Sequence, residues 1–514
     1  MQKNSRTKVV FKDYSPNQIL LLPPSLEEMI DPNHAVRVVN QVIDSLDIDA
    51  LIRKYKGGGC SSYHPRLLLK LLVYGYLTNQ YSSRKIEQAA KQNVHFMWLS
   101  AMSYPDHNTI NRFRSERLKG VLKEVFSQVV LLLVEQGIIT LKEAYLDGTK
   151  IEANANRYTF VWGRSITKSK ERIKKQLDEI WAYAESVARE ELENNEPIFF
   201  EKIDQESVKR TIESIDKALR DKPVNKKIKQ KLNYARKNWP ENLKKYEQQE
   251  KTLGNRNSYS KTDPDATFMR MKEDHMLNGQ LKPGYNWQIS TENQYILGYT
   301  IHQTTNDTTT LESHMESLKE NLGKMPDTLV ADAGYGSEEN YEYLEKNKVE
   351  AYVKYQYFHK EQSKKWRTDP YKVENMTYDE EDDSYTCPAG QKMNFIKEKS
   401  KITNNGFRQV KRLYQSKNCN GCPLRDACNK SRGNRVIEIN QKLNQYKSII
   451  RKRLTSERGI KYRSQRPVDV EAVFGIIKGN RNYRKFLLRG IEKVEIEAGL
   501  LALAHNLSKI AARN

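Results

Sequence analysis

Two short stretches decide the fold of this chain, Tyr145-Leu146-Asp147-Gly148-Thr149-Lys150 and Leu329-Val330-Ala331-Asp332-Ala333-Gly334-Tyr335-Gly336. Each runs from an apolar, strand-like segment into an aspartate that is followed by a glycine-containing turn. A carboxylate at the end of a buried strand is held on a rigid element, which is where an enzyme fixes a metal ligand. A third acid, Glu471, lies in a helical run near the C-terminus. Together the three acids indicate metal-assisted chemistry, although each acid alone also fits a turn or a helix cap.

The balance of charge favours nucleic acid as the partner. The 514 residues include 87 Lys and Arg against 65 Asp and Glu, a formal net charge of +22. Such a charge attracts phosphate or an acidic membrane surface. No apolar run approaches the roughly 20 residues of a transmembrane helix, and the N-terminus lacks the apolar core of a secretory signal. We therefore expect a cytoplasmic, nucleoid-associated protein with no membrane partner.

Residues 1–138 are expected to form a helical DNA-binding domain. Pro65–Leu77 reads as an apolar helix with proline in its first turn, and Ser82 or Ser83 can cap a second helix from Arg84 to Lys91. In the helix that follows Asp106, we expect an apolar side that faces the core, Ile110, Phe113 and Leu118, and three arginines that face outward, Arg112, Arg114 and Arg117. This pattern fits a helix-turn-helix that contacts DNA, and equally an ordinary helical bundle with solvated charges.

The remainder of the chain indicates a mixed α/β core with two insertions. A hairpin over 284–301, a helix over 311–322, the second aspartate strand and a helix over 338–346 predict a mixed sheet covered by helices. We assign residues 139–164, 263–359 and 436–514 to this core. Residues 165–262 read as a charged helical insertion broken by prolines, Pro197, Pro223 and Pro240. Residues 360–435 form a polar, cysteine-rich insertion.

Four cysteines of the second insertion are candidates for a structural zinc site. They are Cys387, Cys419, Cys422 and Cys428. Glycine or proline follows closely after the first and third of them, as in zinc knuckles, and four thiolates would make a closed site. The alternative is four reduced thiols, because the last spacing is unusual. Cys60 stands alone and is interpreted as a bystander.

On its motifs the chain resembles the DDE transposases of bacterial insertion sequences, in the branch with a helical N-terminal module and an RNase H-like core. The resemblance covers nearly the whole chain and rests on these segments: Asp106-His107-Asn108-Thr109, Asp147-Gly148-Thr149-Lys150, Ala331-Asp332-Ala333-Gly334-Tyr335, Glu471-Ala472-Val473-Phe474-Gly475 and Leu487-Leu488-Arg489-Gly490. It implies that Asp147, Asp332 and Glu471 are the catalytic triad and that they bind Mg²⁺ or Mn²⁺. Two ions held by such carboxylates activate the attacking and the leaving oxygen of a phosphodiester.

A further motif of this family is Tyr, Arg, Glu and Lys, separated by two, three and six residues. Here Tyr462, Arg466, Glu471 and Lys478 are separated by three, four and six. The resemblance implies that Tyr462, Arg466 and Lys478 contact DNA. The roles of Tyr462 and Arg466 stay open, because the gaps from Tyr462 to Arg466 and from Arg466 to Glu471 are each one residue longer than in the family motif. Lys478 lies about two helical turns after Glu471 and so on the same face, where it would hold a phosphate or lie solvated.

Charges beside the two aspartates suggest further contacts. Lys150, Arg157 and Lys272 are candidates to touch phosphate. Asp265 is a candidate helper acid or a helix cap.

Three functions follow as hypotheses. The first is a transposase that binds the terminal inverted repeats of its element, cleaves the DNA ends and joins them to double-stranded target DNA, as a dimer or larger assembly. The second is a non-catalytic DNA-binding relative, and the third is a nuclease of the same fold without strand transfer.

Overall fold

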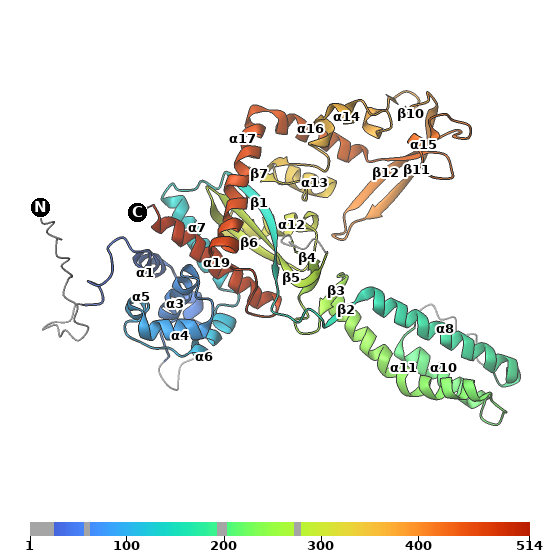
Figure 1. Cartoon of the computed structure of the whole chain (residues 1–514), viewed down its shortest axis with the longest axis horizontal. Helices are drawn as coiled ribbons and strands as arrows, with labels where there is room; N and C mark the ends of the chain where they lie inside the picture. Colours follow the sequence, from blue (N-terminus) through green and yellow to red (C-terminus); the bar gives the residue numbers. More distant parts are fainter. Residues whose placement is uncertain (1–24, 56–61, 193–202, 272–278, 514) are drawn as a thin grey trace, which may run out of the picture.

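The computed structural model describes residues 25–55, 62–192, 203–271 and 279–513 (Figure 1). Its centre is a mixed sheet in the order β4-β5-β1-β7-β8, with β6 paired to β5. β5 runs antiparallel to β1 and β6, whereas β7 and β8 continue from β1 in parallel. The strands are β1 Glu143–Glu152, β4 Thr267–Arg270, β5 Leu281–Glu292, β6 Tyr295–His302, β7 Thr328–Ala331 and β8 Glu350–Val353. This is the mixed α/β, RNase H-like core that the sequence predicts.

Both faces of the sheet are covered, which explains why its strands are buried almost throughout, including the polar residues of β1 and β5. All four residues of β7 are buried, and β5 is buried from Pro283 to Glu292. β6 is packed by α19, Ile491–Ala511, on one face and by α12, Leu311–Leu322, on the other, and β7 is packed by α17, Glu457–Arg466. The turn between β5 and β6 places Asn293 and Gln294 at positive φ, as a two-residue hairpin with the twist of its strands requires.

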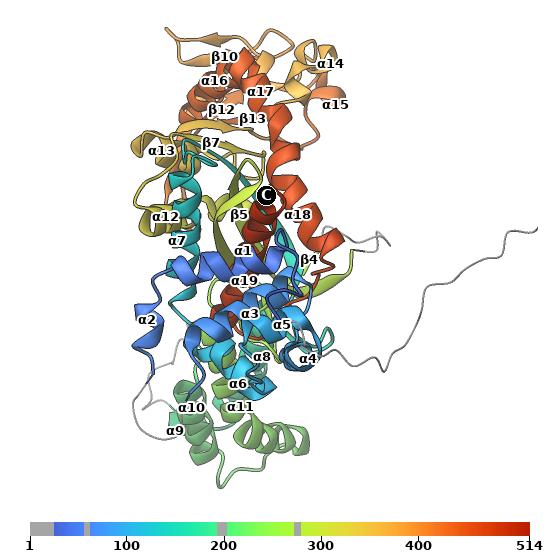
Figure 2. The same cartoon turned by 90° about the vertical axis from the view of Figure 1, so that its left-hand side faces the viewer.

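The N-terminal helices share the hydrophobic core of the sheet. α1 and α3 pack against α19 (Figure 2), and one continuous cluster of buried side chains runs from these helices into β1, β5 and β7. The helices are α1 Ala35–Ser45, α2 Asp49–Ile52, α3 Pro65–Leu77, α4 Ser83–Gln92, α5 Val94–Leu99, α6 His107–Arg112 and α7 Leu122–Glu135. A π-helical turn, Phe113–Arg117, follows α6.

The charged insertion is a helical bundle that projects away from the sheet (Figure 1). It contains α8 Gly163–Val187, α9 Arg189–Leu192, α10 Gln205–Ala218 and α11 Lys226–Leu253, and has a separate hydrophobic core. β2, Phe160–Trp162, pairs with β3, Ser258–Ser260, so the chain enters and leaves the bundle side by side. The expected break at Pro240 is wrong, because α11 continues through it. Pro197 lies outside the described residues.

The cysteine-rich insertion is built on a five-stranded antiparallel sheet in the order β13-β12-β11-β10-β9. Its small core contains Met393, Tyr414, Ile437 and Ile439. The strands are β9 Tyr378–Asp379, β10 Ser384–Thr386, β11 Lys392–Ile402, β12 Arg408–Ser416 and β13 Val436–Ile439. The remaining α-helices are α12 Leu311–Leu322, α13 Glu338–Lys346, α14 Lys364–Arg367, α15 Arg425–Cys428, α16 Gln441–Thr455 and α18 Ala472–Gly475. Among the described residues, no helix has the length and apolar character needed to cross a membrane.

Candidate active site

The three predicted acids meet at a single arginine, Arg466. Its Nη2 lies 3.1 Å from Asp147 Oδ1 and 3.8 Å from Asp332 Oδ2. Its Nη1 lies 2.6 Å from Glu471 Oε1. Carboxylates from a strand, a loop and a helix therefore converge on one point of positive charge.

Strand pairing brings the two aspartates together. β1 and β7 run in parallel with Leu146 opposite Ala331, so the next residue of each strand is an aspartate. The expectation that Asp147 ends its strand is wrong, because β1 continues to Glu152 in register with β5. Only Asp332 follows the end of its strand, and its Oδ1 accepts a hydrogen bond of 2.8 Å from the backbone N–H of Gly334.

Glu471 and Arg466 come from one helix that is interrupted by a π-helical turn, Pro467–Glu471. Proline cannot donate its backbone nitrogen and its ring crowds the preceding turn, which favours a wider turn at this place. A π-helical turn pairs residues five apart, and Arg466 and Glu471 are five apart. The π-helical turn thus accommodates the extra residue that separates Arg466 from Glu471 in comparison with the related motif. As a result, the two side chains meet on one face of the helix.

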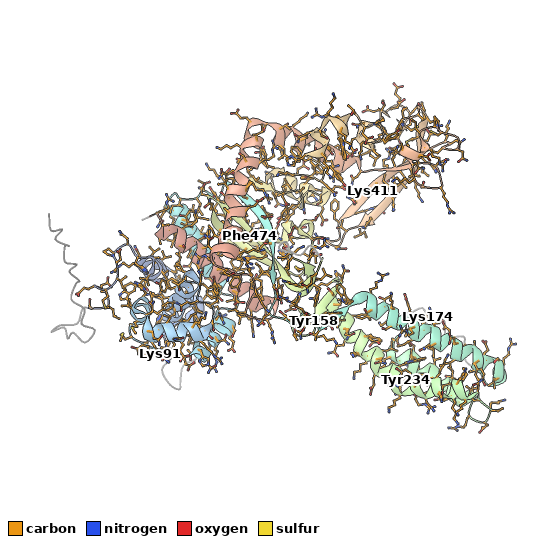
Figure 3. The ribbon with its side chains drawn as sticks, viewed as in Figure 1. Lys91, Tyr158, Lys174, Tyr234, Lys411 and Phe474 are labelled. Carbon is orange, nitrogen blue, oxygen red and sulfur yellow. The ribbon has the colours of Figure 1, made fainter. Side chains whose placement is uncertain are left out.

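The helix is fixed to the sheet on both sides of Glu471. Before it, Asp469 Oδ1 accepts hydrogen bonds from Thr291 Oγ1 at 2.5 Å and from the backbone N–H of Gln294 at 3.1 Å. After it, the Phe474 ring lies 6.0 Å from the ring of Trp287, at the centre of the molecule (Figure 3). These anchors give Glu471 a defined position over β1.

A fourth acid, Asp307, lies beside the triad, and the sequence analysis missed it. Its Oδ1 accepts hydrogen bonds from Asn286 Nδ2 at 2.7 Å and Gln288 Nε2 at 2.9 Å. A side chain at Gly148 would lie 2.8 Å from Asp307 Oδ1, and one at Gly334 would lie 3.6 Å from Asp307 Oδ2. Both glycines therefore leave room for this carboxylate. The alternation of Asn286 and Gln288 along one strand was the available signal.

The site is buried on the side of β1 and open on the other side. The side chains of Arg466 and Asp147 are 6% and 7% exposed, whereas those of Asp332 and Glu471 are 40% and 49% exposed. Burial, followed by the negative charges of three nearby aspartates, raises the pKa of Tyr335 well above its usual value. Burial and the charge of Arg466 lower the pKa of Lys354.

The predicted DNA contacts of the C-terminal motif divide into two groups. Lys478 lies against β1, with Nζ 3.3 Å from the carbonyl oxygen of Lys150, three residues after Asp147. Tyr462 is buried between Tyr145 and Tyr352 and accepts a hydrogen bond of 3.1 Å from Arg458 Nε. Tyr462 therefore supports the helix and, with Arg466, faces the interior.

The predicted contacts of the N-terminal helices divide similarly. Arg112 is exposed, and Ile110, Phe113 and Leu118 are buried as expected. The expectation that Arg114 faces outward is wrong, since only 3% of it is exposed. Its guanidinium donates to Tyr76 Oη and to the carbonyl oxygen of Tyr81.

The reason for the burial of Arg114 is a charge from the far end of the chain. Tyr76 Oη also donates to Glu497 Oε1 at 3.1 Å, and Glu497, a residue of α19, is fully buried. A buried carboxylate requires a nearby cation, and Arg114 supplies it. Arg117 is half-buried, stacks 4.8 Å from the Tyr55 ring and donates to the carbonyl oxygen of Lys54.

Asp265 and Arg157 have structural partners away from the triad. Asp265 Oδ2 accepts a hydrogen bond of 2.9 Å from the backbone N–H of Ile491, the first residue of α19, so it caps that helix. Arg157 pairs with Glu152 at 2.9 Å. Lys272 and Cys60 lie outside the described residues.

A cleft of about 710 Å³ opens beside β1. Its walls include Lys150, Arg270 and Trp162, together with Asn404 and Asn405 at the turn between β11 and β12. The tip of the cysteine-rich insertion therefore reaches the core next to the strand that carries Asp147.

The four cysteines are reduced and partly exposed. Cys419 Sγ accepts a hydrogen bond of 3.3 Å from the backbone N–H of Arg435, and Cys428 Sγ accepts one of 2.7 Å from Arg435 Nη1. In the described part of the chain, no three His, Cys, Asp or Glu side chains are arranged to hold a metal ion. The structure therefore does not bring the four thiols together as a zinc site, and zinc remains a prediction from the sequence.

The triad fits a hard divalent cation by the type of its ligand atoms, although in the described residues these side chains are not grouped around one ion position. Three carboxylates supply only oxygen, which Mg²⁺ and Mn²⁺ prefer, and they converge on one positive group. Arg466 lies among them, so the side chains as they stand pair with a guanidinium.

Comparison with known families agrees with this arrangement. A family model described as transposase DDE domain matches residues 386–511, which include Arg466 and Glu471. A second, described as transposase domain (DUF772), matches residues 24–116. No curated protein matches the chain. The chain is thus similar to two transposase families, one in its N-terminal helices and one in its C-terminal part, which is consistent with a DDE transposase of insertion sequences.

Proposed function

We propose that this protein is a transposase that binds the terminal inverted repeats of its insertion sequence, cleaves the DNA ends and transfers them to target DNA. The observation that carries the proposal is the convergence of Asp147, Asp332 and Glu471, from three separate parts of the chain, on one cation. The two transposase family matches support the same function.

In this proposal the three carboxylates hold Mg²⁺ or Mn²⁺. Such ions, when bound, activate the attacking oxygen and stabilise the leaving oxygen of the phosphodiester. In the same proposal the protein itself positions the DNA: Lys478, whose Nζ lies 3.3 Å from the carbonyl oxygen of Lys150 on β1, neutralises a phosphate and fixes it for in-line attack, and Lys150 is a second candidate contact.

DNA binding is proposed for the cleft beside β1 and for the exposed Arg112, supported by the net charge of +22. We assign residues 1–138 to DNA binding, the three core segments to catalysis, and the insertions over 165–262 and 360–435 to the walls around the DNA. Because two ends must be paired before joining, the active form is proposed to be at least a dimer.

The two other functions make different use of the same residues. A non-catalytic DNA-binding relative would not need three acidic side chains close together. The clustering of Asp147, Asp332 and Glu471 around Arg466 therefore argues against this function. A nuclease would need the triad, and only a joining reaction separates it from a transposase.

The test uses the full-length protein and duplexes that carry the ends of the DNA flanking its coding region. Wild type should cleave these ends in Mg²⁺ and join them to a plasmid. Asp147→Asn, Asp332→Asn and Glu471→Gln should each lose cleavage by at least about 1,000-fold while DNA affinity is retained. Cleavage without joining would identify a nuclease. Undiminished cleavage by the three variants would refute the site.

A further inference from the structure

One guanidinium lies among three carboxylates at the proposed active site. Arg466 donates to Glu471 at 2.6 Å and lies 3.1 Å from Asp147 and 3.8 Å from Asp332. Asp147 has a further partner besides Arg466. Arg466 is thus the shared counter-ion of the triad.

Arg466 is held in this place at a cost. Its side chain is 6% exposed, and its Nε is buried without a hydrogen-bond partner among the described residues. An unpaired buried N–H is unfavourable. The attraction between the guanidinium and the three acids therefore explains why Arg466 is buried here, and a full set of hydrogen bonds to the guanidinium does not. The π-helical turn that follows, Pro467–Glu471, sets the direction of the side chain.

A cation at this point is required when no metal is bound. Asp147 is buried on β1, and a buried carboxylate without a partner strongly destabilises a protein. Asp332 and Glu471 add two further negative charges at the same point. A bound divalent ion would bring its own charge to these oxygens, and a guanidinium in the same place would repel it.

Resting on the proposed function, we propose that Arg466 is an internal counter-ion that keeps the triad assembled without metal and competes with the divalent cation for the carboxylates. It must turn away from Asp147 and Asp332 when the ion binds. A DNA phosphate at the open side of the site is an alternative partner for the released guanidinium. DNA should therefore strengthen metal binding, and by the same factor metal should strengthen DNA binding.

Mn²⁺ binding to the full-length protein, measured by electron paramagnetic resonance without DNA, tests this competition. Arg466→Gln should bind Mn²⁺ at least about ten-fold more tightly than wild type, since it removes the competitor. Arg463→Gln is the matched control: it removes the same charge from the same helix, and its guanidinium lies over the Phe358 ring. It should bind Mn²⁺ as wild type does.

Two further measurements locate the effect. Adding Asp147→Asn to Arg466→Gln should abolish the gain, which places the bound ion at the triad. Arg466→Gln should also melt at a lower temperature than wild type in EDTA and gain more from saturating Mn²⁺, because the metal replaces the lost counter-ion.

Equal or weaker Mn²⁺ affinity of Arg466→Gln would overturn the proposal, as would the absence of Mn²⁺ binding by every form of the protein. If Arg466→Gln does not fold, Arg466→Lys decides, because a shorter cation with fewer donors should compete less, and unchanged affinity in it counts against the proposal. Retained cleavage of the DNA ends by wild type would leave the proposed function standing in each of these cases.

Discussion

Gly148 directly follows Asp147, Gly334 lies two residues after Asp332, and each glycine faces the carboxylate of Asp307. Neither glycine has positive φ, so the reason for the missing side chain is space and not backbone freedom. At Gly148 a methyl group would also collide with the amide of Gln288, which is fully buried. Because neither glycine carries a side chain, the polar side chains of Asn286, Gln288 and Asp307 have room to lie close to the triad.

Gly148→Ala should therefore destabilise the protein by about 1–3 kcal/mol, because an added methyl group in a filled site forces its neighbours to move. The measurement is urea unfolding. Adding Gln288→Ala makes the missing space, so the double variant should be less destabilised than the sum of the two single changes. Strict additivity would show that Gln288 is not the obstacle.

His314 makes the stability of the core depend on pH. It is fully buried, lies 2.6 Å from Ser290 Oγ and 2.8 Å from Thr300 Oγ1, and burial lowers its pKa to about 3. The unfolded chain protonates this residue below about pH 6.5, whereas the folded chain does not until about pH 3. Stability from this residue is therefore complete above pH 6.5 and falls as the pH falls.

The expected loss is about 1.4 kcal/mol for each pH unit between 6.5 and 4. Urea unfolding at several pH values measures it. In His314→Gln, which retains hydrogen-bonding groups but does not titrate, the slope should be smaller by that amount. Equal slopes in the two proteins would contradict the assignment.

Some of these residues could be predicted from the sequence, and others could not. Asp147, Asp332 and Glu471 stand out because each has a recognisable local context. Asp307 lies in a polar loop without such a context, and only the fold brings it to the site. The burial of Arg114 could not be predicted, because Glu497, to which it is linked through the hydroxyl group of Tyr76, comes from the far end of the chain.

Among the helices, too, some could be predicted from the sequence and others could not. The positions of α3, α12 and α13 agree with the predicted ranges residue by residue, because proline, serine and glycine mark their ends. The π-helical turn Pro467–Glu471 could not be predicted, since one extra residue leaves no mark in the pattern of apolar residues. Its trace in the sequence was the longer gap between Arg466 and Glu471.

This turn predicts that one residue can be removed from the helix without loss of the site. Val468 is 54% exposed, and its deletion should convert the π-helical turn to an α-helical one and keep Arg466 and Glu471 on one face. We expect a loss of about 1 kcal/mol, from the hydrogen bond that Gln294 donates to the Val468 carbonyl oxygen. Thermal unfolding and Mn²⁺ binding measure the outcome.

Deletion of Ser464 is the matched control. It lies within the regular part of α17 and would rotate Tyr462 by about 100° relative to Arg466, out of its place between two other tyrosines. This variant should be much less stable. If the two deletions are equally harmful, the π-helical turn does not act as the spacer.

The N-terminal helices and the helical insertion differ in how far their folding depends on the central sheet. The N-terminal helices share its core through α19, so they cannot be removed without exposing it. The helical insertion has a core of its own, and its two ends are joined by the pairing of β2 with β3.

Replacement of residues 164–254 by a short glycine-serine linker should therefore leave a folded core. We expect a melting temperature within a few degrees of wild type, since the large cluster of buried side chains is untouched. Differential scanning calorimetry measures the change. Aggregation, or loss of the cooperative transition, would show that the insertion is part of the folding unit.

The central claim is that Asp147 and Asp332 bind the metal ion that drives cleavage of the DNA ends. Substitution of each aspartate by cysteine tests this most directly, because a thiolate binds Mg²⁺ poorly and softer Mn²⁺ better. The account predicts that Asp147→Cys and Asp332→Cys lose cleavage in Mg²⁺ and recover a measurable part of it in Mn²⁺, whereas the corresponding alanine variants recover none. Cleavage in Mg²⁺ by the cysteine variants at the rate of wild type would contradict it.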